Sequence, residues 1–92
     1  MNIYDKCVEL ALKNYLIEHD LVTDIISKRD RVDFSDELFI QLEQVTNENK
    51  ELFEKLILFA DSIDLNETYK KLSENHNRLS ELDYKIRAKF RI

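Results

Sequence analysis

The 92-residue sequence contains neither glycine nor proline, and this double absence constrains the fold more than any other feature. Tight β-hairpin turns usually need glycine, often in an Asn-Gly pair, because their backbone takes positive φ. The loops that hold phosphates in P-loop and Rossmann proteins need glycine outright. The sequence therefore excludes those nucleotide-binding folds and favours an all-α chain.

Composition and length predict one soluble domain. Apolar residues make up 43% of the chain and charged residues 36%, with a formal net charge of −5, which is typical of a folded globular protein. A chain of this length makes one domain, 1–92, with a thin core. No apolar run approaches the roughly 20 residues that span a bilayer, and the N-terminal MNIYDKCVEL lacks the pattern of a signal peptide. We therefore expect a cytoplasmic protein without a membrane segment.

The middle of the chain predicts a helix over about residues 36–62. Ser35 is the expected N-cap, because its side-chain oxygen can accept a free amide of the first turn. Phe34 before this cap and Phe39 within the helix match a hydrophobic staple. Apolar positions then recur at alternating spacings of four and three, which is typical of a bundle helix; they include Leu38, Leu42, Val45, Leu52, Leu56, Phe59 and Ile63.

A third helix is predicted over about residues 65–90. Asp64 and Glu67 resemble a capping box, with aspartate in place of serine or threonine. The earlier apolar register would continue at Asn66, but the chain supplies Leu65 instead. This change of phase predicts a break near residues 62–65 rather than one continuous rod.

The first segment predicts a helix over about residues 2–29. Its four-three stripe consists of Tyr4, Val8, Ala11, Tyr15, Val22 and Ile25. Glu18 interrupts the stripe, and Asp20 and Thr23 are capping types, so a kink or a split near residues 19–23 stays open. Three helices of similar length with short connections predict an elongated antiparallel three-helix bundle.

The chain ends in YKIRAKFRI, residues 84–92, where apolar and basic residues alternate. The alternation fits a strand or a basic arm, but Ile86 and Phe90 are four apart and so share one helical face. We expect a helix, because basic residues are favoured at a helix C-terminus. In an antiparallel bundle this tail lies beside the start of the second helix, whose acidic residues are Asp33, Asp36, Glu37 and Glu43.

Basic residues gather at one end of the predicted bundle, where the C-terminal tail meets the first connection. This end is either solvated and self-paired or a binding site for an acidic partner. The partner-binding candidates are Lys28, Arg29, Arg31, Lys85, Arg87, Lys89 and Arg91.

No motif in the sequence predicts catalysis, a cofactor or a metal site. His19 and His76 are far apart, and neither belongs to the Glu-x-x-His pattern of di-metal bundles. His76 and Asn49 lie on facing apolar stripes, which predicts a buried polar layer that sets the register. Cys7 is expected to be a buried structural cysteine.

A bundle enzyme such as a chorismate mutase needs cations inside the bundle to hold its dicarboxylate substrate. The middle helix offers Lys50 and Lys55, and both are expected on its outer face. We therefore expect no enzymatic activity.

The segment SIDLNETYKKLSENHNRLSELDYKI resembles the helical hairpin of the small aspartyl-phosphate phosphatases that act on sporulation response regulators. The signature of that family is Ser-Gln-Glu-Leu-Asp. Ser80, Glu81, Leu82 and Asp83 match four of its positions, but no glutamine follows Ser80. The resemblance covers less than a third of the chain and lacks a signature residue, so we assign no activity from it.

A wide apolar stripe on the second helix predicts self-association. Ile40, Ile57 and Leu58 flank that stripe, and three helices alone leave such flanks exposed. We expect a homodimer, because a symmetric pair buries the same patch twice.

Without catalytic chemistry, the function favoured by the sequence is a protein-interaction module that binds and inhibits or regulates a larger protein. The richness in lysine, asparagine and isoleucine is typical of AT-rich genomes, which suggests a phage or mobile-element origin. The alternative is an accessory protein that contacts nucleic acid through the basic end. The acidic net charge of −5 argues against that alternative, because phosphate-binding domains are usually basic.

Overall fold

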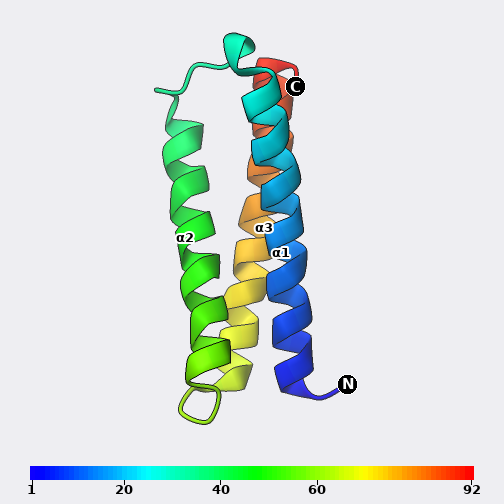
Figure 1. Cartoon of the computed structure of the whole chain (residues 1–92), viewed down its shortest axis with the longest axis vertical. Helices are drawn as coiled ribbons and strands as arrows, with labels where there is room; N and C mark the ends of the chain where they lie inside the picture. Colours follow the sequence, from blue (N-terminus) through cyan, green and yellow to red (C-terminus); the bar gives the residue numbers. More distant parts are fainter.

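The computed structural model describes all 92 residues and contains three long helices and no strand. They are α1 (Ile3–Ser27), α2 (Glu37–Leu58) and α3 (Leu65–Phe90), with a short 3-10 helix, η1 (Arg29–Arg31), after α1. The three helices lie side by side and alternate in direction (Figure 1). The molecule measures 45 × 22 × 18 Å, which confirms the predicted elongated antiparallel bundle.

The first helix runs without interruption, so the split considered near residues 19–23 does not occur. Asn2 caps its start, where the side-chain Oδ1 accepts the backbone N–H of Asp5 at 2.8 Å. Leu21, within the questioned segment, and Ile25, just after it, are both buried in the core. Their burial holds the helix together through a stretch that local capping signals would allow to end.

The buried face of α1 overlaps the predicted stripe only in part, at Ala11 and Ile25. The residues that point into the bundle are Cys7, Ala11, Asn14, Leu21 and Ile25. Tyr15 and Val22, which the four-three spacing assigned to the core, are 54% and 37% exposed. The apolar part of α1 is therefore wider than the part that the other two helices cover.

The start of α2 is capped by Asp36 rather than Ser35, so that prediction is wrong by one residue. Asp36 Oδ1 accepts the backbone N–H of Leu38 at 2.9 Å. Ser35 is engaged elsewhere, because its N–H and its hydroxyl both donate to Asp33 Oδ1, at 3.0 and 2.6 Å. Asp33 therefore binds the Ser35 side chain, which would otherwise have been free to cap the helix.

The predicted contact between Phe34 and Phe39 is present, with ring centroids 5.6 Å apart. Phe39 also stacks on Phe90 of α3 at 5.6 Å. These rings close the end of the bundle where the first connection meets the C-terminus.

The second helix ends at Leu58, earlier than the expected residue 62. The N–H of Phe59 still bonds to the carbonyl of Lys55 at 2.9 Å, and the chain then turns through residues 59–64. Asp64 begins α3, and its Oδ1 accepts the N–H of Glu67 at 3.1 Å. The helical spacing placed Ile63 in the second helix. Instead it lies in the connection between α2 and α3 and packs against the buried cluster that contains Leu56.

The C-terminal stretch is helical as far as Phe90. Arg91 takes a left-handed conformation with φ of 55°, the C-terminal position that glycine usually fills. The N–H of Ile92 bonds to the carbonyl of Arg87 at 3.1 Å. The alternating pattern of this stretch is therefore the end of a helix.

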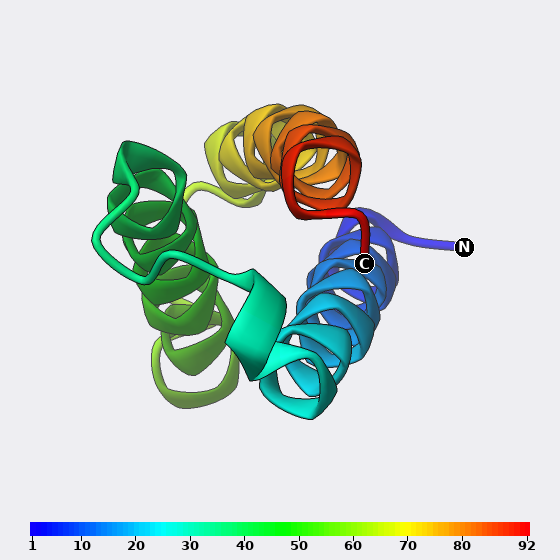
Figure 2. The same ribbon diagram turned by 90° about the horizontal axis from the view of Figure 1, so that it is seen from above.

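The core divides into two clusters, and α3 contributes to both. Viewed along the long axis, α3 lies beside α1 and α2 (Figure 2). The cluster near the C-terminus contains Leu21, Ile25, Leu42, Val45, Leu79, Leu82 and Ile86. The cluster near the N-terminus contains Cys7, Ala11, Leu56 and Leu72.

A buried polar layer joins all three helices and has Asn14 at its centre. The Asn14 amide, fully buried, donates to Asn49 Oδ1 at 3.1 Å and to the Leu72 carbonyl at 3.2 Å. His76 Nδ1 lies 2.9 Å from Asn14 Oδ1, and Asn49 donates to the carbonyl of Ala11 at 3.3 Å. The predicted layer exists, but Asn49 and His76 meet through Asn14 rather than directly.

Candidate functional site

A groove between α1 and α2 has a volume of about 410 Å³. The α1 wall is apolar except for Glu18, and the α2 wall is polar except for Phe53. The lining residues are Ala11, Leu12, Tyr15, Glu18, Thr46, Asn47, Asn49, Lys50 and Phe53.

Apolar side chains extend from this groove along the solvent-facing flank of α1. Leu12, Tyr15, Leu16, Val22 and Ile26 are each between 37% and 58% exposed. Leu12 lies three and four residues from Tyr15 and Leu16, and Val22 lies four residues from Ile26, so each group is close together on the helix surface. A row of this length is more than the scattered apolar residues of an ordinary monomer surface, so this flank is the strongest candidate for a contact surface. We call it the α1 flank.

Two charged side chains, Glu18 and Lys50, line the groove without an ion pair. Burial raises the pKa of the Glu18 carboxyl. Neither residue has a partner of opposite charge within 4 Å. Lys50 was predicted on the outer face of the middle helix; it is exposed, and it borders the groove.

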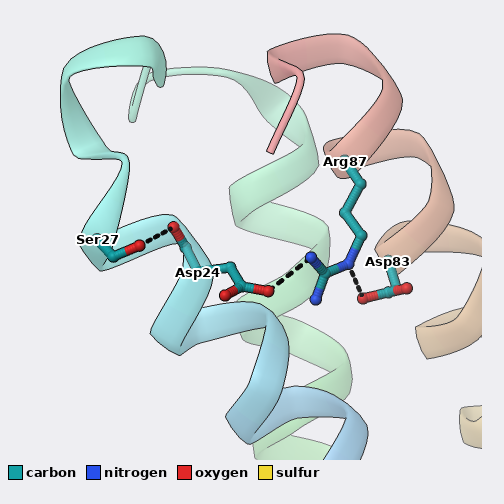
Figure 3. Close-up of polar contacts among 4 residues, drawn as sticks. All are labelled: Asp24, Ser27, Asp83 and Arg87. Carbon is teal, nitrogen blue, oxygen red and sulfur yellow. Dashed lines mark hydrogen bonds and ion pairs between the residues drawn. The ribbon is translucent and has the colours of Figure 1, made fainter.

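Arg87 is held by two carboxylates at the C-terminal end of the bundle (Figure 3). Its guanidinium donates to Asp24 Oδ2 of α1 at 2.7 Å and to Asp83 Oδ1 of α3 at 2.9 Å. The hydrogen bond with Asp24, followed by that with Asp83, raises the pKa of Arg87. This predicted partner-binding residue is thus already paired within the molecule.

Two further basic candidates are also paired with acids. Lys85 contacts Glu81 at 2.8 Å, one turn away on α3, and Lys89 forms an ion pair with Asp36 at the start of α2. Asp36 is one of the four acids expected beside the tail. The tail also contacts an acid of α1, because Arg87 donates to Asp24. This contact was not predicted.

The other four basic candidates have no acidic partner in the molecule. Arg29 donates to the carbonyl of Ile26 at 3.2 Å, and Arg31 donates to the carbonyl of Arg91 at 3.2 Å. Lys28 and the side chain of Arg91 form no ion pair. The basic end therefore divides into a self-paired part on α3 and an unpaired part around η1.

The Asp36–Lys89 contact gives an expected pH dependence. Hydrogen bonds from Lys89 and from the Leu38 N–H lower the pKa of Asp36, so its stabilisation is present above its unfolded pKa of about 3.9 and is lost as pH falls through the lower folded value. We expect Asp36→Asn, which keeps a capping side chain, to flatten the pH dependence of the urea midpoint below pH ~4. Equal slopes for both proteins would show that Asp36 does not contribute.

The three predicted self-association residues are all exposed, but they do not form one patch. Ile40, Ile57 and Leu58 are 56%, 60% and 68% exposed. Ile40 and Leu58 stand at opposite ends of α2, about 27 Å apart at 1.5 Å per residue. Ile57 is four residues beyond Phe53, so it continues the groove side of α2.

Cys7 is buried, as expected. Its thiol donates to the carbonyl of Leu65 at 3.4 Å, and burial raises its pKa. No three histidine, cysteine, aspartate or glutamate side chains gather as a metal site would require. No helix combines the length and apolar character needed to span a bilayer.

Comparison with protein-family models, with curated proteins and with solved structures finds no match for this chain.

Proposed function

We propose that this protein is a non-enzymatic interaction module that binds and inhibits or regulates a larger protein. The observation that carries the proposal is the exposed apolar α1 flank beside the groove. An amphipathic helix docks in such grooves by placing side chains at spacings of three, four and seven residues into the hollow. The groove of about 410 Å³ offers Ala11, Leu12, Tyr15 and Phe53 as its apolar lining.

A protein partner explains the surface better than nucleic acid does. The α1 flank is apolar, whereas a phosphate backbone is bound by clustered lysine and arginine. Three of the seven basic candidates, Lys85, Arg87 and Lys89, are neutralised by the molecule's own acids. Only the unpaired part around η1 supports nucleic-acid contact.

Two exposed tyrosines provide a matched test of the proposed surface. Tyr15 lies in the groove at 54% exposure, and Tyr84 lies on α3, away from the groove, at 74% exposure. A glutamate in place of Tyr15 puts an unpaired carboxylate into the proposed apolar contact with the partner. We expect Tyr15→Glu to abolish stoichiometric capture of a partner protein from the native host, and Tyr84→Glu to retain it. Capture that is equal for both variants would contradict the proposal.

The nucleic-acid alternative has its own test. A gel shift that weakens as salt rises, and that is lost when Arg31 and Arg91 are changed to glutamine, would favour it. Under the proposed function we expect no shift at physiological salt.

A further inference from the structure

We propose that the α1–α2 groove holds one amphipathic helix of a partner protein, which places a lysine or arginine against Glu18 and an acidic residue, about two turns away, against Lys50. The inference rests on the proposed function and deepens it, because it gives the shape and the charge pattern of the partner segment.

The backbone around the groove suits a helix better than an extended segment. The groove is walled by two α-helices, whose backbone N–H and C=O groups bond within each helix. An extended segment laid between them would find no backbone partner, and a buried, unpaired backbone group is costly. A helix bonds its own backbone internally, so it enters the groove with these groups already satisfied.

The groove is about two helical turns long. Its lining runs from Ala11 to Glu18 on α1 and from Thr46 to Phe53 on α2. Each stretch advances by seven residues, which is about 10 Å at 1.5 Å per residue. No residue of α3 lines the groove, so it opens on a side of the bundle that α3 does not cover. A helix laid there would complete a four-helix arrangement.

The buried polar layer fixes where the two groove charges lie along the bundle. Asn49 bonds to Asn14 at 3.1 Å and to the carbonyl of Ala11 at 3.3 Å, so it lies level with the segment between these two residues. The helices run in opposite directions, so Lys50, the next residue of α2, lies close to the level of Ala11. Glu18 is seven residues further along α1, so about 10 Å separate the two charged residues along the bundle axis.

Neither charge of the groove has a counter-ion within the chain. Glu18 is half-buried, burial raises the pKa of its carboxyl, and no cation lies within 4 Å of it. Lys50 forms no ion pair either. A partly buried carboxylate without a partner is costly, and a cation that approaches from the groove would offset this cost with a charge-assisted hydrogen bond.

The α2 wall adds a second acid at the Glu18 end. Glu43 lies seven residues before Lys50, so the two share one side of α2 and are about 10 Å apart. Glu43 is exposed and forms no ion pair. The groove is therefore negative at the end of Glu18 and Glu43 and positive at the end of Lys50, which calls for the opposite order of charges in the helix that it binds.

Between its charged ends the groove is apolar on the α1 side. Leu12 and Tyr15 are 47% and 54% exposed there. The partner helix therefore needs apolar side chains between its two charged residues, at spacings of three and four. The expected segment has a basic and an acidic residue seven positions apart on one face, with that apolar stripe between them.

A displayed library of single helices tests the inference without a known partner. The library consists of alanine-rich helices in which one face is randomised. Helices are selected on the wild type and counter-selected on Tyr15→Glu, so that groove binders are retained. We expect these binders to share a basic and an acidic residue seven positions apart, with apolar residues between them.

A charge exchange then locates the contact. We expect Glu18→Lys to raise the dissociation constant of a synthetic copy of the best binder about tenfold or more. Replacing the basic residue of that peptide with glutamate should restore most of the affinity for this variant. Glu74→Lys, the same change on the exposed surface of α3, should leave binding unchanged. Fluorescence anisotropy measures the dissociation constants, and circular dichroism verifies the helix content of each variant.

Three results would overturn the inference. The first is a library that yields no helix whose binding depends on Tyr15. The second is a set of groove binders that lack the charge pattern or bind the wild type and Glu18→Lys equally well. The third is a wild type that sediments at twice the monomer mass of 11.1 kDa and becomes monomeric in Tyr15→Glu, because a second copy then occupies the groove.

The proposed function fails separately, through partner capture that survives Tyr15→Glu. Capture that is lost in Tyr15→Glu but retained in Glu18→Lys would keep the interaction surface and refute the charge pattern.

Discussion

Replacing Leu56 with alanine is expected to lower the free energy of unfolding by about 2–5 kcal/mol. Leu56 has no exposed surface and packs in the cluster near the N-terminus with Cys7, Ala11 and Leu72. These side chains are held by two other helices, α1 and α3, so they cannot collapse fully into the space that the leucine leaves. Urea unfolding followed by circular dichroism measures the loss at a fixed protein concentration.

Leu58 is the matched control for this substitution. It is the same residue type two positions along α2, and it is 68% exposed. Leu58→Ala is expected to change the free energy of unfolding by less than about 0.5 kcal/mol. Leu52, which the sequence placed in the core with Leu56, is half-buried, so Leu52→Ala should fall between the two. Equal losses at all three positions would contradict the described core.

Asn14→Leu is expected to lower the free energy of unfolding by roughly 2–4 kcal/mol, because it removes the centre of the polar layer. The substitution preserves much of the volume but leaves Asn49 Oδ1 and His76 Nδ1 without the partner that satisfies them. An unsatisfied buried polar group costs about 1–3 kcal/mol. The gain from burying leucine in place of an amide offsets a part of this loss.

Asn77→Leu is the control, since Asn77 is exposed on α3 and makes no side-chain hydrogen bond within the chain. It should alter the urea midpoint little. If Asn14→Leu were as stable as the wild type or more so, the layer would contribute specificity of register without net stability, and our expectation for Asn14 would be wrong.

The number, order and direction of the helices could be predicted because periodicity reports burial directly. The four-three pattern placed Leu42, Val45 and Leu56 of α2 in the core, where they are found. Helix ends were harder to predict. Ser35 and Asp36 are both good caps, and the choice between them depends on Asp33, which bonds to Ser35.

The groove could not be predicted, because periodicity does not tell which part of a wide apolar stripe is covered. Tyr15 and Val22 fit the core spacing as well as Ala11 does, and only the position of α3 against α1 decides among them. A signal was present in the unusual width of the apolar face around Leu12 and Leu16. Asn14 was overlooked because an asparagine among apolar neighbours carries no periodic signal of its own.

The pairing of Arg87 with Asp24 was missed for a related reason. The two residues are 63 positions apart, and their contact depends on the register of α1 against α3. The acids near the start of α2 were considered because hairpin neighbours are simple to align. The first and third helices are not neighbours in the sequence, so no short connection indicates how they align.

The contacts between the first and last helices have a consequence for synthesis on the ribosome. Cys7 bonds to Leu65, Asn14 to Leu72, and Asp24 to Arg87, so each contact joins residues 58 or more positions apart. The α1 helix therefore emerges long before the helix that buries it. Until α3 has left the exit tunnel, the nascent chain carries its apolar faces uncovered, and a premature stop within α3 would yield a product that chaperones and proteases recognise rather than a smaller folded domain.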